Sequence, residues 1–123
     1  WPLEGVAEVK FYLINPDAPS AFTPLVLGDG SLNGTRLPKE GVALTDEQEL
    51  ALREALLRGR PDYPKAMCFY PHHSFVLLDS ESRILGVIDV CFQCLNHSGP
   101  KGIEEYIDFA VVADIVEQLG YPV

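Results

Sequence analysis

Two apolar runs with a short polar turn between them constrain the fold of this chain more than any other feature. Residues 74–79 read SFVLLD, residues 83–91 read RILGVIDVC, and Ser80-Glu81-Ser82 lies between them. Two runs rich in β-branched and apolar residues on either side of such a turn are typical of a β-hairpin. Because both runs are apolar on both faces, the two strands are predicted to be central in a sheet or covered on both sides.

Two helices are predicted on either side of this hairpin in the chain. Thr45 and Gln48 have the spacing of a capping box, and Gly59 suits the position after a helix C-terminus, so the first helix is predicted over about 46–58. Asp108 can cap a second helix over about 108–119, which Gly120 ends. Apolar residues recur there at every fourth position: Ile103, Ile107, Val111, Ile115 and Leu119.

The N-terminal third combines one clear strand with a long segment rich in glycine and proline. Residues 7–15, AEVKFYLIN, are predicted to form a strand, whereas residues 16–44 contain only short candidate strands around 24–27 and 35–37. So long a segment either contains further strands or forms a functional surface. The order of elements predicts a single α+β domain over 1–123, in which two helices pack on a small antiparallel sheet.

Charge and hydropathy narrow the range of partners. The chain has 18 acidic and 9 basic residues, a net charge of −9, so it repels phosphate backbones and no nucleic-acid partner is expected. No apolar run approaches the roughly 18 residues of a membrane-spanning helix, so no transmembrane segment is expected, and the expected partner is a protein or a small molecule. The chain begins at Trp1, and removal of a signal or lipoprotein peptide would explain that start.

All three cysteines and all three histidines lie between residues 68 and 97. If Asp79 faces Arg83 across the turn, the hairpin places Asp89 opposite His73 and brings Cys94 to Cys68. A slip of one residue would exchange the faces, but any tight turn gathers these residues at one end of the hairpin. The gathered set is Cys68, His72, His73, Cys91, Cys94 and His97.

A disulfide is the first chemistry that this cluster permits. Facing strand positions have Cα atoms roughly 4.5–5.5 Å apart, a separation that a disulfide can span. Cys68 could pair with Cys94 or with Cys91, and Cys91–Cys94 is the third pairing. An odd number of cysteines leaves one thiol free.

Zinc is the second chemistry. Cys91-x-x-Cys94 would present two thiolates to one ion, and a tetrahedral zinc site needs two further ligands. Cys68 and one of the histidines would supply them, the candidates being His72, His73 and His97.

Thiol catalysis, either redox or hydrolytic, is the third chemistry that this cluster permits. Cys-x-x-Cys is a redox motif where it opens a helix, but here the loop sequence LNHSGPKG follows it. A nucleophile from Cys91, Cys94 or Cys68 could act with His73 and Asp89. The same residues also have purely structural explanations: inert buried thiols, a His72-His73 pair at a strand entry, His97 on a loop surface, and Asp89 paired with His73 or a lysine or directed to solvent.

The run MCFYPHHSFVLLDSESRILGVIDVCFQC, with LGYP near the C-terminus, resembles a group of small uncharacterised bacterial proteins. These proteins share a cysteine followed by a proline and a basic or histidine residue, an apolar hairpin and a closing Cys-Phe-x-Cys. The resemblance covers roughly residues 44–123 and matches at Cys68, Pro71, His73, Cys91, Phe92 and Cys94. Many members look like exported proteins or lipoproteins, so the resemblance implies a periplasmic, secreted or lipid-anchored setting, in which disulfides persist; it implies no activity.

These observations favour a small globular binding or accessory domain. A disulfide or a bound metal would stabilise its Cys/His cluster, and its ligand surface is expected on the 16–44 segment. A thiol-dependent enzyme and a zinc-binding protein are the two alternatives.

Overall fold

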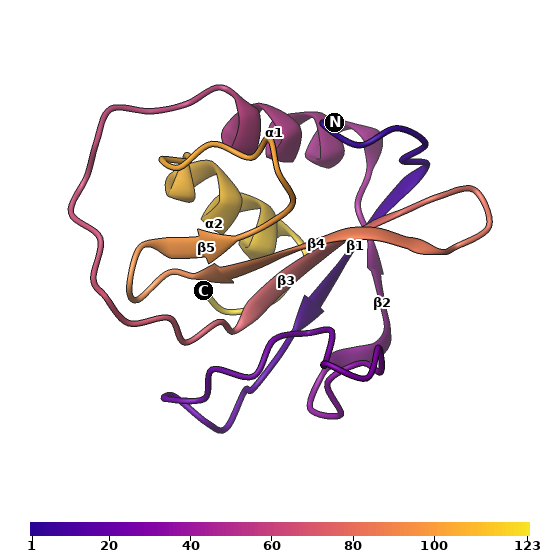
Figure 1. Ribbon diagram of the computed structural model, residues 1–123, viewed down its shortest axis with the longest axis horizontal. Coiled ribbons are helices and arrows are strands. Elements are labelled where there is room, and N and C mark those ends of the chain that lie inside the picture. Colours follow the sequence, from indigo (N-terminus) through magenta and orange to yellow (C-terminus); the bar gives the residue numbers. More distant parts are fainter.

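A five-stranded antiparallel sheet with two helices on one face forms the frame of the molecule (Figure 1). The computed structural model describes residues 1–123 and confirms the predicted α+β class. The strand order is β2-β1-β3-β4-β5, which makes β3 the central strand. The elements are β1 (Glu8–Leu13), β2 (Leu37–Ala43), α1 (Asp46–Leu57), β3 (His73–Leu78), β4 (Ile84–Cys91), β5 (Asn96–Ser98) and α2 (Phe109–Gln118).

The helix boundaries follow from the capping residues. The Thr45 hydroxyl accepts from the Gln48 amide at 3.2 Å, and the Gln48 side chain accepts from the Thr45 amide at 3.0 Å, which completes the predicted capping box. The Asp108 carboxylate accepts from the Val111 amide at 3.2 Å at the start of α2. Neither helix has the length and apolar character needed to cross a bilayer.

Apolar side chains fill both faces of the sheet. Phe11 and Phe75 belong to the larger cluster, which lies between the sheet and the helices. Tyr12 and Val76, their neighbours along β1 and β3, belong to a smaller cluster with Leu25 on the opposite face. The segment 14–36 covers that second face (Figure 1). Every residue of β3 is therefore buried, as the apolar pattern predicted.

The predicted pairing of the β3–β4 hairpin is correct next to the turn, but it shifts by one residue at the next pair. Leu78 pairs with Ile84, as a turn in which Asp79 faces Arg83 requires, but Leu77 pairs with Gly86. Leu85 is therefore an extra residue in β4. A bulge of this kind displaces every later pair by one position, and no feature of the turn itself announces it.

The bulge changes which residues share a face of the sheet. His73 pairs with Val90 and Ser74 pairs with Asp89, so the prediction that Asp89 lies opposite His73 is wrong. Successive residues of a strand point to opposite faces. His73 consequently lies on the helix face, whereas Asp89 lies on the face covered by the segment 14–36.

Two strands were missed because both are at sheet edges. The sequence LPKEGVA of β2 contains a proline, a glycine and two charged residues, and the candidate strand around 35–37 overlaps it only at Leu37. An edge strand tolerates such residues because half of its backbone needs no partner in the sheet. Gly41 has φ +73°, and a Cβ there would lie 2.7 Å from the Tyr12 ring. β5 has only three residues, and the strand expected around 24–27 is an isolated bridge between Val26 and Leu32.

Candidate functional site

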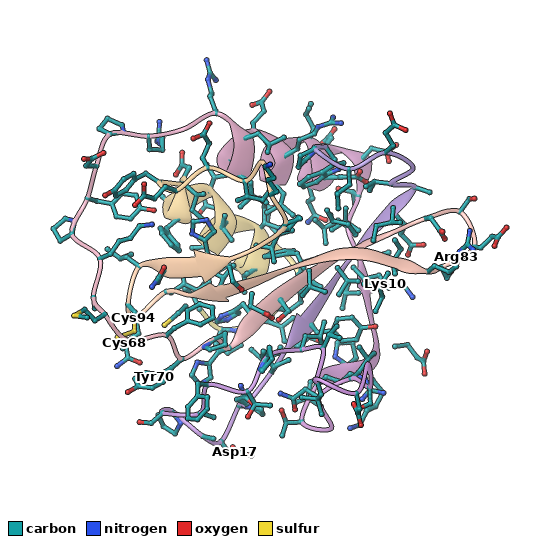
Figure 2. All side chains as sticks on the ribbon, viewed as in Figure 1. Lys10, Asp17, Cys68, Tyr70, Arg83 and Cys94 are labelled. Carbon is teal, nitrogen blue, oxygen red and sulfur yellow. A yellow bond between two sulfur atoms is a disulfide. The ribbon has the colours of Figure 1, made fainter.

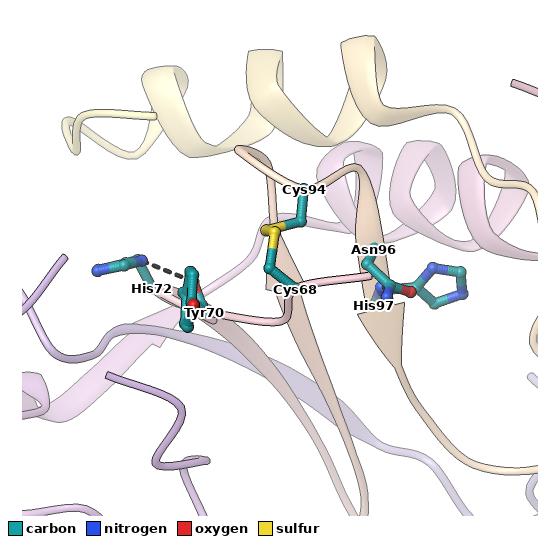
Figure 3. The surroundings of a disulfide bond; sticks show 6 residues. All are labelled: Cys68, Tyr70, His72, Cys94, Asn96 and His97. Atoms are coloured by element: carbon teal, nitrogen blue, oxygen red, sulfur yellow. Dashed lines mark hydrogen bonds between the residues drawn. A yellow bond between two sulfur atoms is a disulfide. The ribbon is translucent and has the colours of Figure 1, made fainter. Parts of the chain in front are cut away.

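Cys68 and Cys94 form a disulfide at the end of the β3–β4 hairpin (Figure 3). Their Cα atoms are 5.9 Å apart, within the range that disulfides span. Of the three pairings that the sequence left open, this is the one found. It joins the irregular segment 58–72 to the turn between β4 and β5, where the Ala66 amide also donates to the Cys94 carbonyl at 3.1 Å.

Cys91 is the remaining thiol, and it is only 1% exposed at the end of β4. The Cys-x-x-Cys motif is thus divided between a buried thiol and one half of a disulfide. Reactive cysteines need solvent access and a neighbour that stabilises the thiolate. Cys91 has neither the access nor a hydrogen bond from any histidine, because the ring nitrogens of the histidines contact only carbonyl groups or nothing.

His72 and His97 point to opposite sides of the disulfide (Figure 3). His97 Nε2 lies 2.9 Å from the Glu104 carbonyl oxygen, and its ring packs edge-on against Phe109. Burial lowers the pKa of His97, although the hydrogen bond to Glu104 acts in the opposite direction. His97 therefore packs against the loop before α2 instead of lying free on a loop surface.

The predicted zinc ligands are not brought together as a metal site. Cys68 and Cys94 are bonded to each other, so neither sulfur is a thiolate ligand. The structure contains no group of three or more His, Cys, Asp or Glu side chains that could hold a metal ion.

His73 lies in an aromatic pocket of the helix face. Its Nε2 donates to the Pro122 carbonyl at 2.7 Å, and its ring packs edge-on against Phe92 with 4.9 Å between centroids. The side chain is 4% exposed, and Nδ1 is buried without a partner. Burial lowers the pKa of His73 more than the bond to Pro122 raises it, so the neutral ring is the favoured form. The C-terminal segment is held against β3 through this contact.

A concave pocket of about 510 Å³ lies beside His72 and His73, where β1 and β3 meet the C-terminal segment. This volume is within the range of small-molecule sites. The polar groups at the pocket are the two histidines and Gln93. The apolar walls are formed by Leu13, Pro16, Pro19, Phe92, Pro122 and Val123.

Only some of the residues that line this pocket were predicted from the sequence. Pro16 and Pro19 belong to the 16–44 segment on which a ligand surface is expected, and His73 and Phe92 are among the residues in which the sequence resembles a bacterial group. Pro122 belongs to the C-terminal LGYP, and its carbonyl is the partner of His73. The approach of the C-terminus to β3 is a tertiary contact, and no local pattern predicts it.

Asp89 anchors the segment 14–36 to the sheet. It is 6% exposed, and its Oδ1 accepts from the Ser74 hydroxyl and from the Leu25 amide, the latter at 3.4 Å. No ion pair includes Asp89, so the expectations of a histidine or lysine partner and of solvent exposure are wrong. Burial raises the pKa of Asp89, and its two hydrogen bonds act in the opposite direction.

An asparagine pair that the sequence analysis missed holds both ends of the same segment. The Asn15 side-chain amide donates to the carbonyls of Thr23 and Pro71 at 2.8 and 3.0 Å. The Asn33 side-chain amide donates to Asn15 Oδ1 at 3.0 Å. Buried polar groups of this kind are stable only when their hydrogen bonds are made. Asn15 has φ +51°, a conformation that asparagine adopts more readily than most residues, so Asn-Pro at the end of a strand was the available signal.

Asp89→Asn is expected to reduce the loss of stability that accompanies a rise in pH above about 4, the ordinary pKa of an aspartate. Because the pKa of Asp89 is raised in the folded protein, the folded state binds more protons than the unfolded state once the pH exceeds the unfolded pKa. Stability therefore falls as the pH rises through the folded pKa. Asparagine can still accept both hydrogen bonds and carries no charge. Urea unfolding at several pH values measures the slope.

Asp79→Asn is the matched control, because the pH dependence of stability that Asp79 contributes has the opposite sign. Hydrogen bonds from the Arg83 backbone and side chain lower the pKa of Asp79, so its contribution is present above the unfolded pKa and is lost as the pH falls. An Asp89→Asn variant whose pH profile coincided with that of the original chain would contradict the buried, proton-binding role of Asp89.

The comparisons with family models, curated proteins and solved structures gave no match to this chain. The geometry of the pocket, the disulfide and the buried thiol therefore carries the functional argument.

Proposed function

We propose that this chain is an extracytoplasmic binding or accessory domain whose ligand occupies the pocket beside His72 and His73. The observation that supports this most strongly is the pocket itself. It is concave, its walls are mainly apolar, and its few polar groups lie close together, as in most small-ligand sites. The pocket also joins residues from β1, β3, the β4–β5 turn and the C-terminus, so only the folded chain presents it.

The disulfide supports the extracytoplasmic setting. Disulfides persist in the periplasm, at cell surfaces and in secreted proteins, and they are rare in reducing compartments. Cys68 is only half-buried, so a cellular thiol could reach this bond and reduce it. A protein that depends on the Cys68–Cys94 link suits an oxidising compartment.

An uncharged apolar group is the ligand chemistry that suits the pocket. Leu13, Phe92 and the prolines offer apolar contact area, while the net charge of −9 opposes the approach of anions. A small aromatic molecule or an apolar side chain of a protein partner would fit this description. The thiol-enzyme alternative receives no support, because Cys91 is buried and no histidine is bonded to it.

Gln93→Trp is expected to lower the affinity for an apolar probe by about tenfold, because an indole at this exposed lining position fills the pocket mouth. N-Phenyl-1-naphthylamine is a suitable probe, since it is uncharged, and its fluorescence rises in apolar surroundings when it is excited directly. A fluorescence titration of the folded protein gives the affinity of each variant.

Ser80→Trp is the matched control. It adds the same side chain at the turn of the β3–β4 hairpin, near Arg83, and Figure 2 shows Arg83 at the opposite end of the molecule from Cys68 and Cys94. This variant should bind the probe as the original chain does. Absence of probe binding, or equal loss in both variants, would refute the pocket as the ligand site.

A further inference from the structure

One wall of the pocket is an exposed strap, defined here as residues 16–20. Pro16 and Pro19 of the strap line the pocket, yet all five strap residues are exposed, so little apolar burial holds the strap in place. Its anchors are the Asn15 network on one side and the buried Leu25 on the other. The Ala18 amide donates to the adjacent Asn15 carbonyl at 3.2 Å, and the other hydrogen bond that leaves residues 16–22 joins the Ala18 carbonyl to His72.

The His72 ring has a carbonyl oxygen at each nitrogen. Nδ1 lies 2.8 Å from the Tyr70 oxygen, and Nε2 lies 3.2 Å from the Ala18 oxygen. A neutral imidazole has one N–H group, whereas the imidazolium has two. Carbonyl oxygens only accept hydrogen bonds, so both contacts are hydrogen bonds only when His72 carries its second proton.

Deprotonation removes the longer of the two contacts. The neutral ring keeps its hydrogen on Nδ1, where the Tyr70 oxygen is nearer, and the lone pair of Nε2 then faces the lone pairs of the Ala18 oxygen. The attraction that holds the strap becomes a repulsion. Figure 3 shows the retained bond between His72 and Tyr70, beside the disulfide that fixes this segment.

We propose that His72 is a proton-dependent latch of the pocket: its imidazolium holds the strap in place, and its neutral ring releases it. This inference rests on the proposed function for its ligand, because the pocket that the strap borders is the proposed binding site. Release of the strap withdraws the pocket wall that Pro16 and Pro19 form. The ligand is therefore held at low pH and released as the pH rises.

The surroundings of the two neighbouring histidines disfavour a positive charge on His73. His73 is almost fully buried, and its burial lowers the pKa of His73, as does the charge of His72 to a smaller extent. His72 is half-buried, and both of its ring nitrogens face carbonyl oxygens. The charged or titratable residues on the elements around His72 are Asp17 on the strap, Tyr70 on the preceding segment, Tyr12 on β1, His73 on β3, and Asp89 and Cys91 on β4.

The binding test compares the affinity for N-phenyl-1-naphthylamine at about pH 5.5 and about pH 8, on either side of the range in which histidine side chains change charge. The affinity should fall about fivefold at the higher pH, the effect of one hydrogen bond of ordinary net strength. His72→Gln should abolish this pH dependence. His97→Gln is the matched control and should retain it, since His97 lies outside the pocket. A fivefold change that survived in His72→Gln would overturn the latch.

A second measurement needs no ligand. The ¹⁵N spectrum of the His72 ring should show two N–H groups at the lower pH and one at the higher pH, and relaxation of the Ala18 methyl group should report greater motion after the proton is lost. Unchanged Ala18 relaxation across the His72 titration would overturn the latch. Failure of the probe to bind at either pH would instead refute the proposed function, so the two failures are distinguishable.

Discussion

Replacing both Cys68 and Cys94 with serine is expected to lower the free energy of unfolding by about 3–4 kcal/mol. The bond joins positions separated by 26 residues, so its loss restores considerable freedom to the unfolded chain. The segment 58–72, which has no helix or strand, loses its covalent attachment to the sheet at the same time. Urea unfolding without reductant measures the effect.

Two controls accompany this prediction. A reductant should destabilise the original chain by a similar amount and should leave the double serine variant unchanged. A thiol count on the denatured, unreduced protein should find one free thiol, that of Cys91. A count of three, or an unchanged urea midpoint in the double variant, would contradict a stabilising disulfide.

Phe11→Ala is expected to cost about 3–5 kcal/mol of stability, the usual effect of removing a buried aromatic ring. Phe11 is fully buried, and its ring centroid lies 5.4 Å from that of Phe75 and 5.2 Å from that of Tyr121. Tyr121 precedes Pro122, the partner of His73, so the cavity should also loosen the pocket wall. Thermal unfolding and probe titration measure the two effects separately.

Phe22→Ala is the matched control, since Phe22 is 76% exposed. Surface substitutions of this kind usually change stability by less than about 0.5 kcal/mol. Comparable destabilisation by Phe11→Ala and Phe22→Ala would contradict the assignment of Phe11 to the core.

Local patterns predicted the elements that are locally determined. The capping box at Thr45, the Asp108 cap and the two apolar runs each depend on residues a few positions apart, and all three are confirmed. β2 was not predictable in the same way because its proline, glycine and charges are tolerated only at a sheet edge. Whether a segment lies at an edge depends on the whole sheet.

The candidate site was predicted less completely, for two physical reasons. The bulge at Leu85 shifts the register, so Asp89 meets Ser74 instead of His73, and turn residues do not encode a bulge several positions away. The partner of His73 is a backbone carbonyl at Pro122, and every residue offers such a carbonyl. The Cys68–Cys94 disulfide was among the predicted pairings because any tight hairpin turn brings the segments that follow its two strand ends close together.

The strand order has a consequence for the way in which the chain assembles. β1 lies between β2 and β3, and its Leu13 pairs with His73 far along the chain. The β3–β4 hairpin can close locally, but β1 can pair with β3 only after that part of the chain is available. Contacts between such distant positions slow folding, because a long loop must close before they form. A chain emerging N-terminus first therefore cannot complete its sheet until the C-terminal half follows.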